Sequence, residues 1–220
     1  MQIYAVIPAY NESKTVGKII LMTKKYCNVI VVDDGSKDGT ADIAKKAGAI
    51  VVRHEINMGY GKGLHDGINA ALSHGADAVI TLDSDGQHDP NDIPKFVKSL
   101  ESGADIVIGS RFLEGKSWGT RKRMIALRLL ALQFWVFTGL RLTDVQSGFR
   151  AYRAKVFDKI KLSESGMAFS VELPIKAKKL GYRFSEVPIT IGKPAQLKSF
   201  SSALRQGKEI GVAIIKHSLL

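Results

Sequence analysis

Residues 78–90 read Ala78-Val79-Ile80-Thr81-Leu82-Asp83-Ser84-Asp85-Gly86-Gln87-His88-Asp89-Pro90. The first five are apolar or β-branched, which predicts a short buried strand. Two carboxylates separated by one residue follow this strand, with a glutamine oxygen two residues further on. Hard cations such as Mg²⁺ and Mn²⁺ take oxygen ligands of this kind. The segment therefore predicts a divalent-cation site at Asp83, Asp85 and Gln87, although a polar turn that closes a strand also contains Asp, Ser and Gly.

Apolar runs alternate with amphipathic stretches on both sides of this segment. Strands are predicted at residues 3–7, 29–32, 50–52, 78–82 and 106–108, and helices at 12–25, 38–46, 61–74 and 91–101. Strands that alternate with helices of this length predict a mostly parallel α/β sheet covered on both faces. Polar loops follow four of the strands, at residues 8–12, 33–39, 57–63 and 83–90. Because ligands bind at the carboxyl ends of parallel strands, these loops predict a nucleotide site.

The pattern changes after residue 109. Basic residues without an acidic one among them occur at 116–128, and residues 125–140 are almost entirely apolar. A basic flank beside an aromatic-rich helix is typical of the membrane interface, so we predict an interfacial helical segment at residues 116–140. A buried core helix is the alternative. Further strands are predicted at 151–153 and 184–191, a helix at 171–180, and an amphipathic helix at 201–220.

Composition limits the class of protein. With 220 residues, 45% of them hydrophobic, the chain can form one core, so we predict a single domain over residues 1–220. The net charge of +11 predicts an acidic partner, which leaves nucleic acid, an anionic membrane and phosphorylated substrates open. Cys27 is the only cysteine, which fits a reducing compartment. Met1 leads directly into a predicted strand and no apolar run reaches the ~18–20 residues of a transmembrane helix, so a cytoplasmic protein is expected.

Five motifs together resemble family 2 glycosyltransferases, and within them the dolichyl-phosphate (polyprenyl-phosphate) mannose synthases. In order they are Pro8-Ala9-Tyr10-Asn11-Glu12, Val32-Asp33-Asp34-Gly35-Ser36, Asn57-x-Gly59-x-Gly61-Lys62-Gly63, Asp83-x-Asp85-x-Gln87-His88-x-Pro90 and Ser147-Gly148-Phe149-Arg150. The resemblance implies a GT-A fold. It also implies metal-dependent, inverting transfer of a hexose from a nucleoside-diphosphate sugar, mannose from GDP-mannose, to a polyprenyl monophosphate.

The resemblance also implies roles for individual residues. Pro8, Tyr10 and Glu12 would line the nucleotide pocket, with Asp33 or Asp34 against the base or ribose. Asp83 would lie beside the ribose and sugar, and Asp85 and Gln87 would hold Mg²⁺ or Mn²⁺ against the diphosphate. Arg111 matches the arginine that binds the acceptor phosphate, so the catalytic residues would be Asp85 and Arg111. Further acceptor-phosphate contacts are expected from Arg121, Lys122, Arg123 and Lys198, the last in a segment whose register differs from the family pattern.

Other residues are expected to have local roles. His88 is interpreted as a hydrogen-bonding turn residue, and Asp144 is expected to orient Arg150 or the acceptor loop. His54, His65, His74 and His217 have no metal-ligand spacing, so no zinc site is predicted.

Alternative functions share parts of this pattern. A UDP-glucose or other UDP-sugar transferase acting on the same lipid, and a transferase acting on a soluble saccharide, would carry the same motifs. A nucleic-acid-binding protein would have aromatic residues interleaved with the basic ones, so nucleic acid is not an expected partner. A nonenzymatic sugar-nucleotide sensor is a further alternative. Expected partners are the sugar nucleotide, the lipid phosphate and the cytoplasmic face of a membrane, with a membrane-anchoring subunit or the interfacial helix providing attachment.

Overall fold

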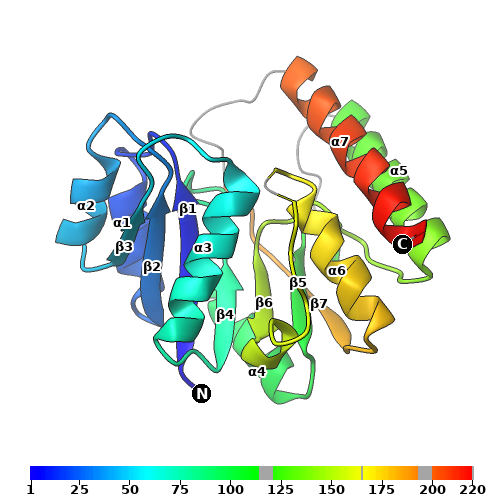
Figure 1. Ribbon diagram of the computed structural model, residues 1–220, viewed down its shortest axis with the longest axis horizontal. Helices are drawn as coiled ribbons and strands as arrows, with labels where there is room; N and C mark the ends of the chain where they lie inside the picture. Colours follow the sequence, from blue (N-terminus) through cyan, green and yellow to red (C-terminus); the bar gives the residue numbers. More distant parts are fainter. Residues whose placement is uncertain (114–120, 165, 193–199, 220) are drawn as a thin grey trace.

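The computed structural model describes residues 1–113, 121–164, 166–192 and 200–219. Over these residues the chain forms a seven-stranded sheet with helices on both faces (Figure 1). The strands are β1 (Ile3–Ala9), β2 (Asn28–Asp33), β3 (Ile50–Arg53), β4 (Ala78–Thr81), β5 (Ile106–Ser110), β6 (Arg150–Arg153) and β7 (Phe184–Pro188). The helices are α1 (Val16–Thr23), α2 (Thr40–Lys46), α3 (Tyr60–Ser73), α4 (Ile93–Glu101), α5 (Arg121–Thr138), α6 (Phe169–Lys179) and α7 (Phe200–Leu219).

The strand order is β3-β2-β1-β4-β6-β5-β7, and every pair is parallel except the two that involve β6. Arg150 at the start of β6 pairs with Thr81 near the end of β4 and with Ile108 in β5. The antiparallel strand therefore begins at the edge where the parallel strands end. This topology brings the turn before β6 to the same edge as the predicted polar loops.

Alternate residues of each strand pack on opposite faces of the sheet, as the pleat requires. Val6 and Val32 belong to a hydrophobic cluster that includes residues of α3, α5, α6 and α7. Ile7 and Val31 belong to a second cluster with α1, α2 and α4. The near-continuous apolar strands thus reflect a sheet covered on both sides, which confirms the predicted α/β class.

Among the predicted boundaries that differ from the structure, three show a local cause or replacement. Helix α1 begins at Val16 instead of residue 12, and residues 13–15 form a turn in which the backbone N–H of Thr15 donates to the carbonyl of Glu12 (3.1 Å). The helix predicted from residue 91 begins as a 3₁₀ turn, capped by the Asp89 carboxylate, and α4 follows it. The last strand ends at Pro188, and Ile191 makes only an isolated bridge to His88.

Helices α5 and α7 lie side by side next to α6 (Figure 1). Phe134 of α5 and Ile210 and Ile214 of α7 are fully buried in the core on this side of the sheet. The predicted C-terminal helix therefore packs on its own chain. Within the described residues no helix combines the length and the apolar character needed to cross a bilayer.

Candidate functional site

The loops after β1 and β2 are tied together at the carboxyl edge of the sheet. The backbone N–H of Asn11 donates to Ser36 Oγ (2.9 Å), and that of Glu12 donates to Thr40 Oγ1 (2.9 Å). Asn11 has a left-handed backbone with φ 54°, which asparagine tolerates better than most residues. These contacts hold two of the predicted polar loops in one place.

The predicted donor-binding residues of the first loop differ in exposure. Pro8 is buried, and its carbonyl accepts a hydrogen bond from Ser84 Oγ (2.9 Å), which joins this loop to the loop after β4. Tyr10 is 48% exposed, so its ring is accessible to a planar ligand. Glu12 is half-buried, and Thr15 Oγ1 donates to its Oε2 (2.8 Å). Pro8 is thus held in place near the end of β1, and the ring of Tyr10 in the loop that follows is accessible.

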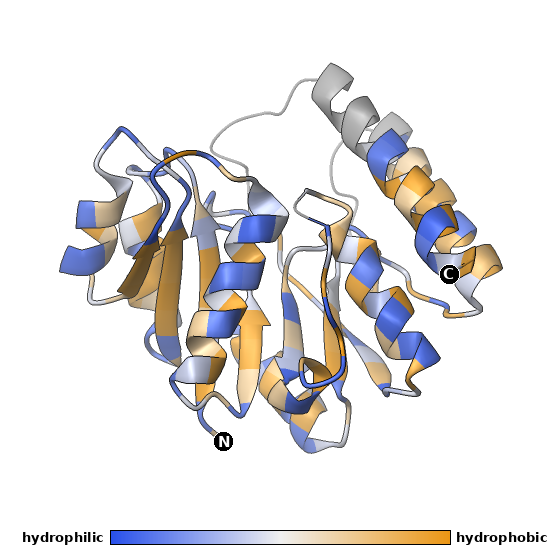
Figure 2. Cartoon of the chain, in the orientation of Figure 1, coloured by the Kyte–Doolittle hydropathy of each residue, from blue (hydrophilic) through white to orange (hydrophobic). Residues whose placement is uncertain are grey.

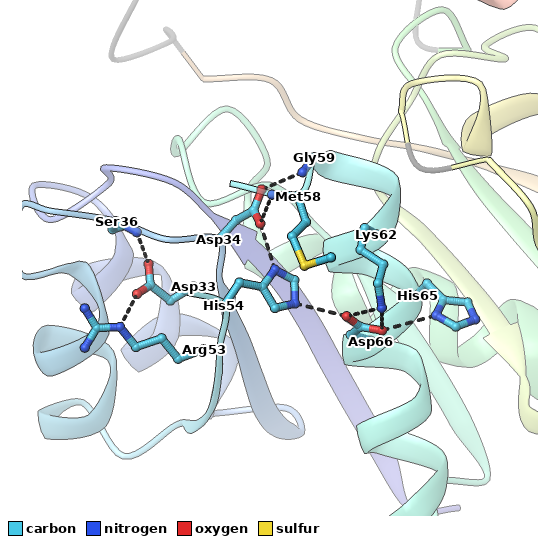
Figure 3. Close-up of polar contacts among 10 residues, drawn as sticks. All are labelled: Asp33, Asp34, Ser36, Arg53, His54, Met58, Gly59, Lys62, His65 and Asp66. Atoms are coloured by element: carbon cyan, nitrogen blue, oxygen red, sulfur yellow. Dashed lines mark hydrogen bonds and ion pairs between the residues drawn. The ribbon is translucent and has the colours of Figure 1, made fainter. Parts of the chain in front are cut away.

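Asp33 is fully buried at the end of β2 (Figure 3). Its Oδ1 accepts a hydrogen bond from the backbone N–H of Ser36 (3.3 Å). Its Oδ2 lies 3.4 Å from Arg53 Nε as an ion pair and has no hydrogen-bond partner among the described residues. Asp33 therefore contacts both the loop that follows it and the last residue of β3.

Asp34 connects β2 with the turn that precedes α3 (Figure 3). Its Oδ1 accepts from the backbone N–H of Met58 (2.8 Å), and its Oδ2 accepts from that of Gly59 (2.9 Å). The same Oδ1 lies 2.7 Å from His54 Nδ1. Asp34 thus has three protein partners and is only 5% exposed.

Asp83 follows β4 and lies against the turn before β6. Tyr60 Oη donates to Asp83 Oδ1 (3.1 Å). Burial, followed by the negative charge of Asp83, raises the pKa of Tyr60 well above its ordinary value, so the phenol stays neutral and can donate. A Cβ at Gly148 would lie 2.8 Å from both Asp83 Oδ1 and Tyr60 Oη, which explains why glycine occupies this position.

His88 has the local role predicted from the sequence. The backbone N–H of Asp83 donates to His88 Nδ1 (3.1 Å), and the ring packs against Phe149 with centroids 5.2 Å apart. The side chain is buried. His88 therefore fixes the shape of the loop after β4.

Asp85 and Gln87 face each other across a glycine turn. The backbone N–H of Gln87 donates to Asp85 Oδ1 (3.0 Å), and the Gln87 amide donates to Asp85 Oδ2. Gly86 between them has φ 79°, a left-handed conformation that favours glycine. An open groove of about 370 Å³ runs beside this loop and is also lined by Lys18 of α1 and by Lys14, which precedes that helix.

The donor atoms of this loop fit a hard divalent cation. Asp83 and Asp85 offer carboxylate oxygens and Gln87 an amide oxygen, the ligand type that Mg²⁺ and Mn²⁺ prefer. No group of three or more His, Cys, Asp and Glu side chains in the described part of the chain could hold a metal. Two carboxylates leave most positions around such an ion to the amide oxygen, to water and to the phosphates of a ligand.

Arg111 follows β5 at the same edge of the sheet and makes a two-point ion pair with Asp144. Its Nε lies 2.5 Å from Oδ2 and its Nη2 lies 2.6 Å from Oδ1 of the carboxylate. The two side chains are 10% and 1% exposed. The guanidinium is therefore held in a fixed orientation at the end of β5.

Glu186 of β7 holds the loop that carries Asp144. Its carboxylate accepts hydrogen bonds from the backbone N–H of Thr143 (2.9 Å), from Thr143 Oγ1 (2.9 Å) and from the backbone N–H of Asp144 (3.3 Å). Burial raises the pKa of Glu186 above its ordinary value. Thr143 Oγ1 also lies 2.6 Å from Ser110 Oγ, so the residue before Arg111 belongs to the same network.

Asp144 was expected to orient Arg150 or the acceptor loop; in the structure it contacts Arg111 and not Arg150, and the role of Arg111 at the acceptor remains a prediction. Arg150 is instead held by three carbonyl oxygens, those of Ser147 (2.7 Å), Val145 (2.7 Å) and Ser170 (2.6 Å). A buried guanidinium with five donors can be satisfied by backbone carbonyls alone, so Arg150 needs no carboxylate partner here.

The remaining predicted acceptor residues lie at or outside the limits of the described structure. Arg121 is exposed at the first residue of α5. Lys122 and Arg123 follow it in the same helical turn, and their side chains lie outside the description, as does Lys198 entirely. Their role in phosphate binding remains a prediction.

Three site residues were missed by the sequence analysis: Tyr60, Thr143 and Glu186. Tyr60 lies within one of the five motifs, at a variable position, so its spacing from Asp83 carried no signal. Thr143 and Glu186 meet only because the loop before β6 crosses to the end of β7. A glutamate within a predicted strand, two residues before Pro188, was the available signal for Glu186.

Comparisons with known proteins agree with this architecture. Residues 4–161 match the model of the family described as glycosyl transferase family 2. The undecaprenyl-phosphate mannosyltransferase of Micrococcus luteus is 32% identical over 98% of this chain and 92% of that protein. The UDP-N-acetylglucosamine–dolichyl-phosphate N-acetylglucosaminyltransferase of Methanococcus voltae is 33% identical over 85% of this chain and 84% of that protein.

Among solved structures, the fold is similar to that of glucosyl-3-phosphoglycerate synthase from Mycobacterium tuberculosis, in a complex with Mn²⁺, UDP and glucosyl-3-phosphoglycerate. The TM-score is 0.79 at 21% identity, and the match covers 100% of this chain and 80% of that one. This similarity confirms the predicted GT-A fold. With the family match over most of its length, the chain belongs to glycosyl transferase family 2 and is a glycosyltransferase.

Proposed function

We propose that this glycosyltransferase moves a hexose from a nucleoside-diphosphate sugar to the phosphate of a polyprenyl phosphate at a membrane surface. The observation that carries the proposal is the placement of opposite charges at one sheet edge. The carboxylate loop of Asp83 and Asp85 follows β4, and the fixed guanidinium of Arg111 follows β5. Strand β6, which begins at this edge, separates the two. One side suits a cation-bound diphosphate and the other an anionic acceptor.

On the donor side, Tyr10 offers a ring face to the base, and Asp34 with the Met58–Gly59 turn borders the ribose. Asp83, Asp85 and Gln87 would hold Mg²⁺ or Mn²⁺, which supplies positive charge to the departing diphosphate. Tyr60 keeps Asp83 oriented through its hydrogen bond. Lys14 and Lys18 add positive charge along the groove beside Asp85.

On the acceptor side, the nucleophile is a phosphate oxygen that is already ionised. The site therefore needs no strong general base; it needs cations that hold the phosphate in line with the anomeric carbon. Arg111 has this role, and its orientation is fixed by Asp144. Arg121, Lys122, Arg123 and Lys198 are further candidates for the same phosphate. The names of the two curated relatives, which specify undecaprenyl and dolichyl phosphate, support a lipid acceptor.

An apolar surface on α5 and α7 supports attachment to a membrane. On α5 the exposed residues Ile125, Leu129, Leu132 and Val136 follow one another at helical spacing, and on α7 so do Val212, Ile215 and Leu219. Figure 2 shows apolar residues along both helices. Arg121 and Arg128, both exposed, flank this surface, as expected for a helix pair that lies on anionic lipid. We place the enzyme on the cytoplasmic face, with the apolar surface or a membrane-anchoring subunit as its attachment.

The donor is proposed to be GDP-mannose. The mannosyltransferase of Micrococcus luteus supports this choice, whereas the relative from Methanococcus voltae uses a UDP-sugar. A UDP-sugar transferase on the same lipid is therefore the second candidate. The two differ in a few contacts to the base and sugar, and the loops around Tyr10 and Asp34 are where those contacts would be made.

The test is a transfer reaction in parallel mixtures. Purified protein is incubated with Mn²⁺ or Mg²⁺, a short polyprenyl phosphate in detergent, and GDP-mannose, UDP-glucose or UDP-N-acetylglucosamine. Lipid-linked sugar is followed by mass spectrometry. Product from GDP-mannose alone supports the first candidate, and product from a UDP-sugar supports the second. A soluble phosphorylated acceptor that is glycosylated in place of the lipid would overturn the proposal.

A further inference from the structure

A buried histidine links the donor loop to helix α3. His54 lies just after β3 and is 9% exposed. Its Nδ1 is 2.7 Å from Asp34 Oδ1, and its Nε2 is 3.0 Å from Asp66 Oδ2 (Figure 3). Both ring nitrogens therefore face a carboxylate, one from the residue after β2 and one from α3.

This geometry has a consequence for the protons of the ring. An ionised carboxylate can only accept hydrogen bonds, whereas a neutral imidazole has one donor and one acceptor nitrogen. Both contacts of His54 are satisfied only when both nitrogens carry a proton. The contact with Asp34 therefore requires a proton on Nδ1, and the contact with Asp66 requires one on Nε2.

Asp66 is in turn held by its own helix. Lys62 Nζ lies 2.5 Å and 2.6 Å from the two oxygens of Asp66, one helical turn away, and His65 Nδ1 lies 3.2 Å from its Oδ1. Burial acts to raise the pKa of Asp66, but the hydrogen bonds from Lys62 and His65 lower it below the ordinary value. Lys62 and His65 thus hold the carboxylate of Asp66 beside His54.

The other end of this chain of contacts is the Met58–Gly59 turn, which we propose borders the donor. Asp34 accepts the backbone N–H groups of Met58 and Gly59. The loop that contains Gly35 packs directly on the same turn, because a Cβ at Gly35 would lie 2.7 Å from the carbonyl carbon of Ile56. Any displacement of Asp34 would therefore move both loops.

We propose that His54 and Asp66 are positioning residues that hold Asp34 and the Met58–Gly59 turn in the geometry that binds the nucleoside diphosphate of the donor. The proposal rests on the donor side of the proposed function. Only the contact with Asp34 reaches the residues that we propose border the donor. A variant of His54 that keeps this contact alone should therefore retain most donor binding. A variant that keeps only the contact with Asp66 should lose donor binding.

Asparagine and glutamine separate the two contacts. The amide nitrogen of His54→Asn replaces Nδ1 and can donate to Asp34, whereas that of the longer His54→Gln replaces Nε2 and can donate to Asp66. His54→Ala removes both. His65→Ala is the control, because His65 also contacts Asp66 but its side chain is 41% exposed and does not reach Asp34.

Binding of GDP and UDP with Mn²⁺ is measured by calorimetry, and donor KM and kcat by transfer where product forms. A lost hydrogen bond between charged groups weakens binding by about tenfold or more. We expect this rise in nucleotide Kd and donor KM for His54→Ala and His54→Gln, a smaller rise for His54→Asn, no change for His65→Ala, and kcat within about twofold throughout. Equal Kd values in wild type and folded His54→Ala and His54→Asn variants would overturn the proposal while leaving the proposed function intact.

A second measurement needs no transfer activity. Nitrogen-15 NMR of labelled protein reports which nitrogens of His54 carry a proton. A proton on Nδ1, which the contact with Asp34 requires, is expected, and a ring whose only proton lies on Nε2 would overturn the proposal. If the wild-type protein binds nucleotide but transfers no sugar to any lipid, the proposed function fails, and nucleotide binding by the His54 variants still tests the positioning role of His54. If the wild-type protein binds no nucleotide, both the proposed function and the positioning role fail.

Discussion

Arg111 and Asp144 are 33 residues apart in sequence and form a buried ion pair in which Nε and Nη2 of the arginine each meet one carboxylate oxygen. The backbone N–H of Arg111 donates to the same carboxylate (3.2 Å). Asp144 thus fixes both the backbone and the side chain of the residue that we assign to the acceptor phosphate. A guanidinium held in this way is positioned before the substrate arrives, which lowers the cost of ordering it during catalysis.

Replacing Asp144 by Asn should therefore impair use of the acceptor. The amide keeps the shape of the carboxylate but loses its charge and one acceptor oxygen, so Arg111 is held less firmly. We expect the KM for polyprenyl phosphate to rise about tenfold to a hundredfold, in line with the loss of a charged hydrogen bond, with little change in the KM for the donor. Steady-state kinetics with each substrate varied in turn measures both.

Asp158→Asn is the matched control, because Asp158 is exposed and the same change should leave both KM values unchanged. An Asp144→Asn variant that melts at the wild-type temperature and uses the lipid with a wild-type KM would contradict the positioning role of Asp144.

Gly148→Ala should abolish activity in a folded protein. The added methyl group would lie 2.8 Å from Asp83 Oδ1 and Tyr60 Oη, so either the carboxylate or the turn before β6 must move. We expect turnover to fall by at least about a hundredfold, since small displacements at a reacting centre have effects of this size. Gly207→Ala on α7 is the control, because nothing lies within 4 Å of its added methyl group. Parallel circular dichroism and transfer assays compare the two, and a fully active Gly148→Ala enzyme would exclude this packing constraint.

The sequence predicted most of the sheet because its strands are apolar runs bounded by polar loops. The predicted placement of the four polar loops at one edge follows from the parallel βα pattern. The place of the antiparallel strand β6 in the sheet was harder to predict, because the sequence of a four-residue strand such as Arg150–Arg153 does not indicate which strands it pairs with. Its position between β4 and β5 depends on tertiary pairing alone.

The side-chain partners of the site were the least predictable part. His54 has its two carboxylate partners 20 residues before and 12 residues after it, and neither spacing corresponds to a local motif. The sequence analysis considered His54 only as a metal ligand. Contacts of this kind depend on how β2, β3 and α3 pack against one another, and the hydrophobic periodicity of the sequence does not predict that packing.

The apolar surface of α5 and α7 should mediate binding to lipid. Replacing Leu129 and Val136, which are 59% and 67% exposed, by Gln removes apolar area without disturbing the buried face that contains Phe134. Burial of each such side chain contributes about 1.5–3 kcal/mol, so we expect the double variant to bind anionic liposomes at least about tenfold more weakly. Leu21→Gln on α1, where Leu21 is 61% exposed, is the control. Sedimentation with vesicles measures binding, and equal binding of all three proteins would refute the membrane role of this surface.

The basic residues at the start of α5 should contribute to the same binding. The triple variant Arg121→Ser, Lys122→Ser and Arg123→Ser removes three positive charges, each worth about 1 kcal/mol near an anionic surface. We expect weaker binding to vesicles that contain anionic lipid at low salt and a smaller difference at high salt, where the charges are screened. Unchanged binding at low salt would show that these residues face away from the membrane.

The docking of α7 should weaken in acid. Hydrogen bonds from Lys216 and then His217 lower the pKa of Glu164 below its ordinary value of 4.5. A carboxylate whose pKa is lower in the folded state stabilises the fold above its unfolded pKa, and this contribution is lost as the pH falls through the folded value. Glu164→Gln should therefore reduce the free energy of unfolding by about 1–2 kcal/mol at pH 7, and the difference from wild type should shrink below pH 4. Urea titrations at pH 7 and below pH 4 measure this difference in the free energy of unfolding. The exposed Glu101 provides the control variant Glu101→Gln, and a difference independent of pH would contradict the assignment.

Asp85→Asn should separate metal-dependent chemistry from nucleotide recognition. Asn keeps one oxygen and can still accept the backbone N–H of Gln87, which in the wild-type protein donates to Asp85 Oδ1 (3.0 Å), so the turn should keep its shape. The lost negative charge weakens the hold on Mn²⁺, and with it the stabilisation of charge on the departing diphosphate. We expect Mn²⁺ affinity, measured in the presence of GDP or UDP, to fall at least about tenfold, turnover to fall further, and the melting temperature to stay within about 2 °C.

Asp89→Asn is the control in the same loop, because Asp89 caps the turn at Pro90–Asp92 and asparagine caps as well as aspartate does. Because the control changes the same atoms four residues away, loss of Mn²⁺ binding in both variants would point to a general effect of charge, whereas loss in Asp85→Asn alone would identify Asp85 as a ligand.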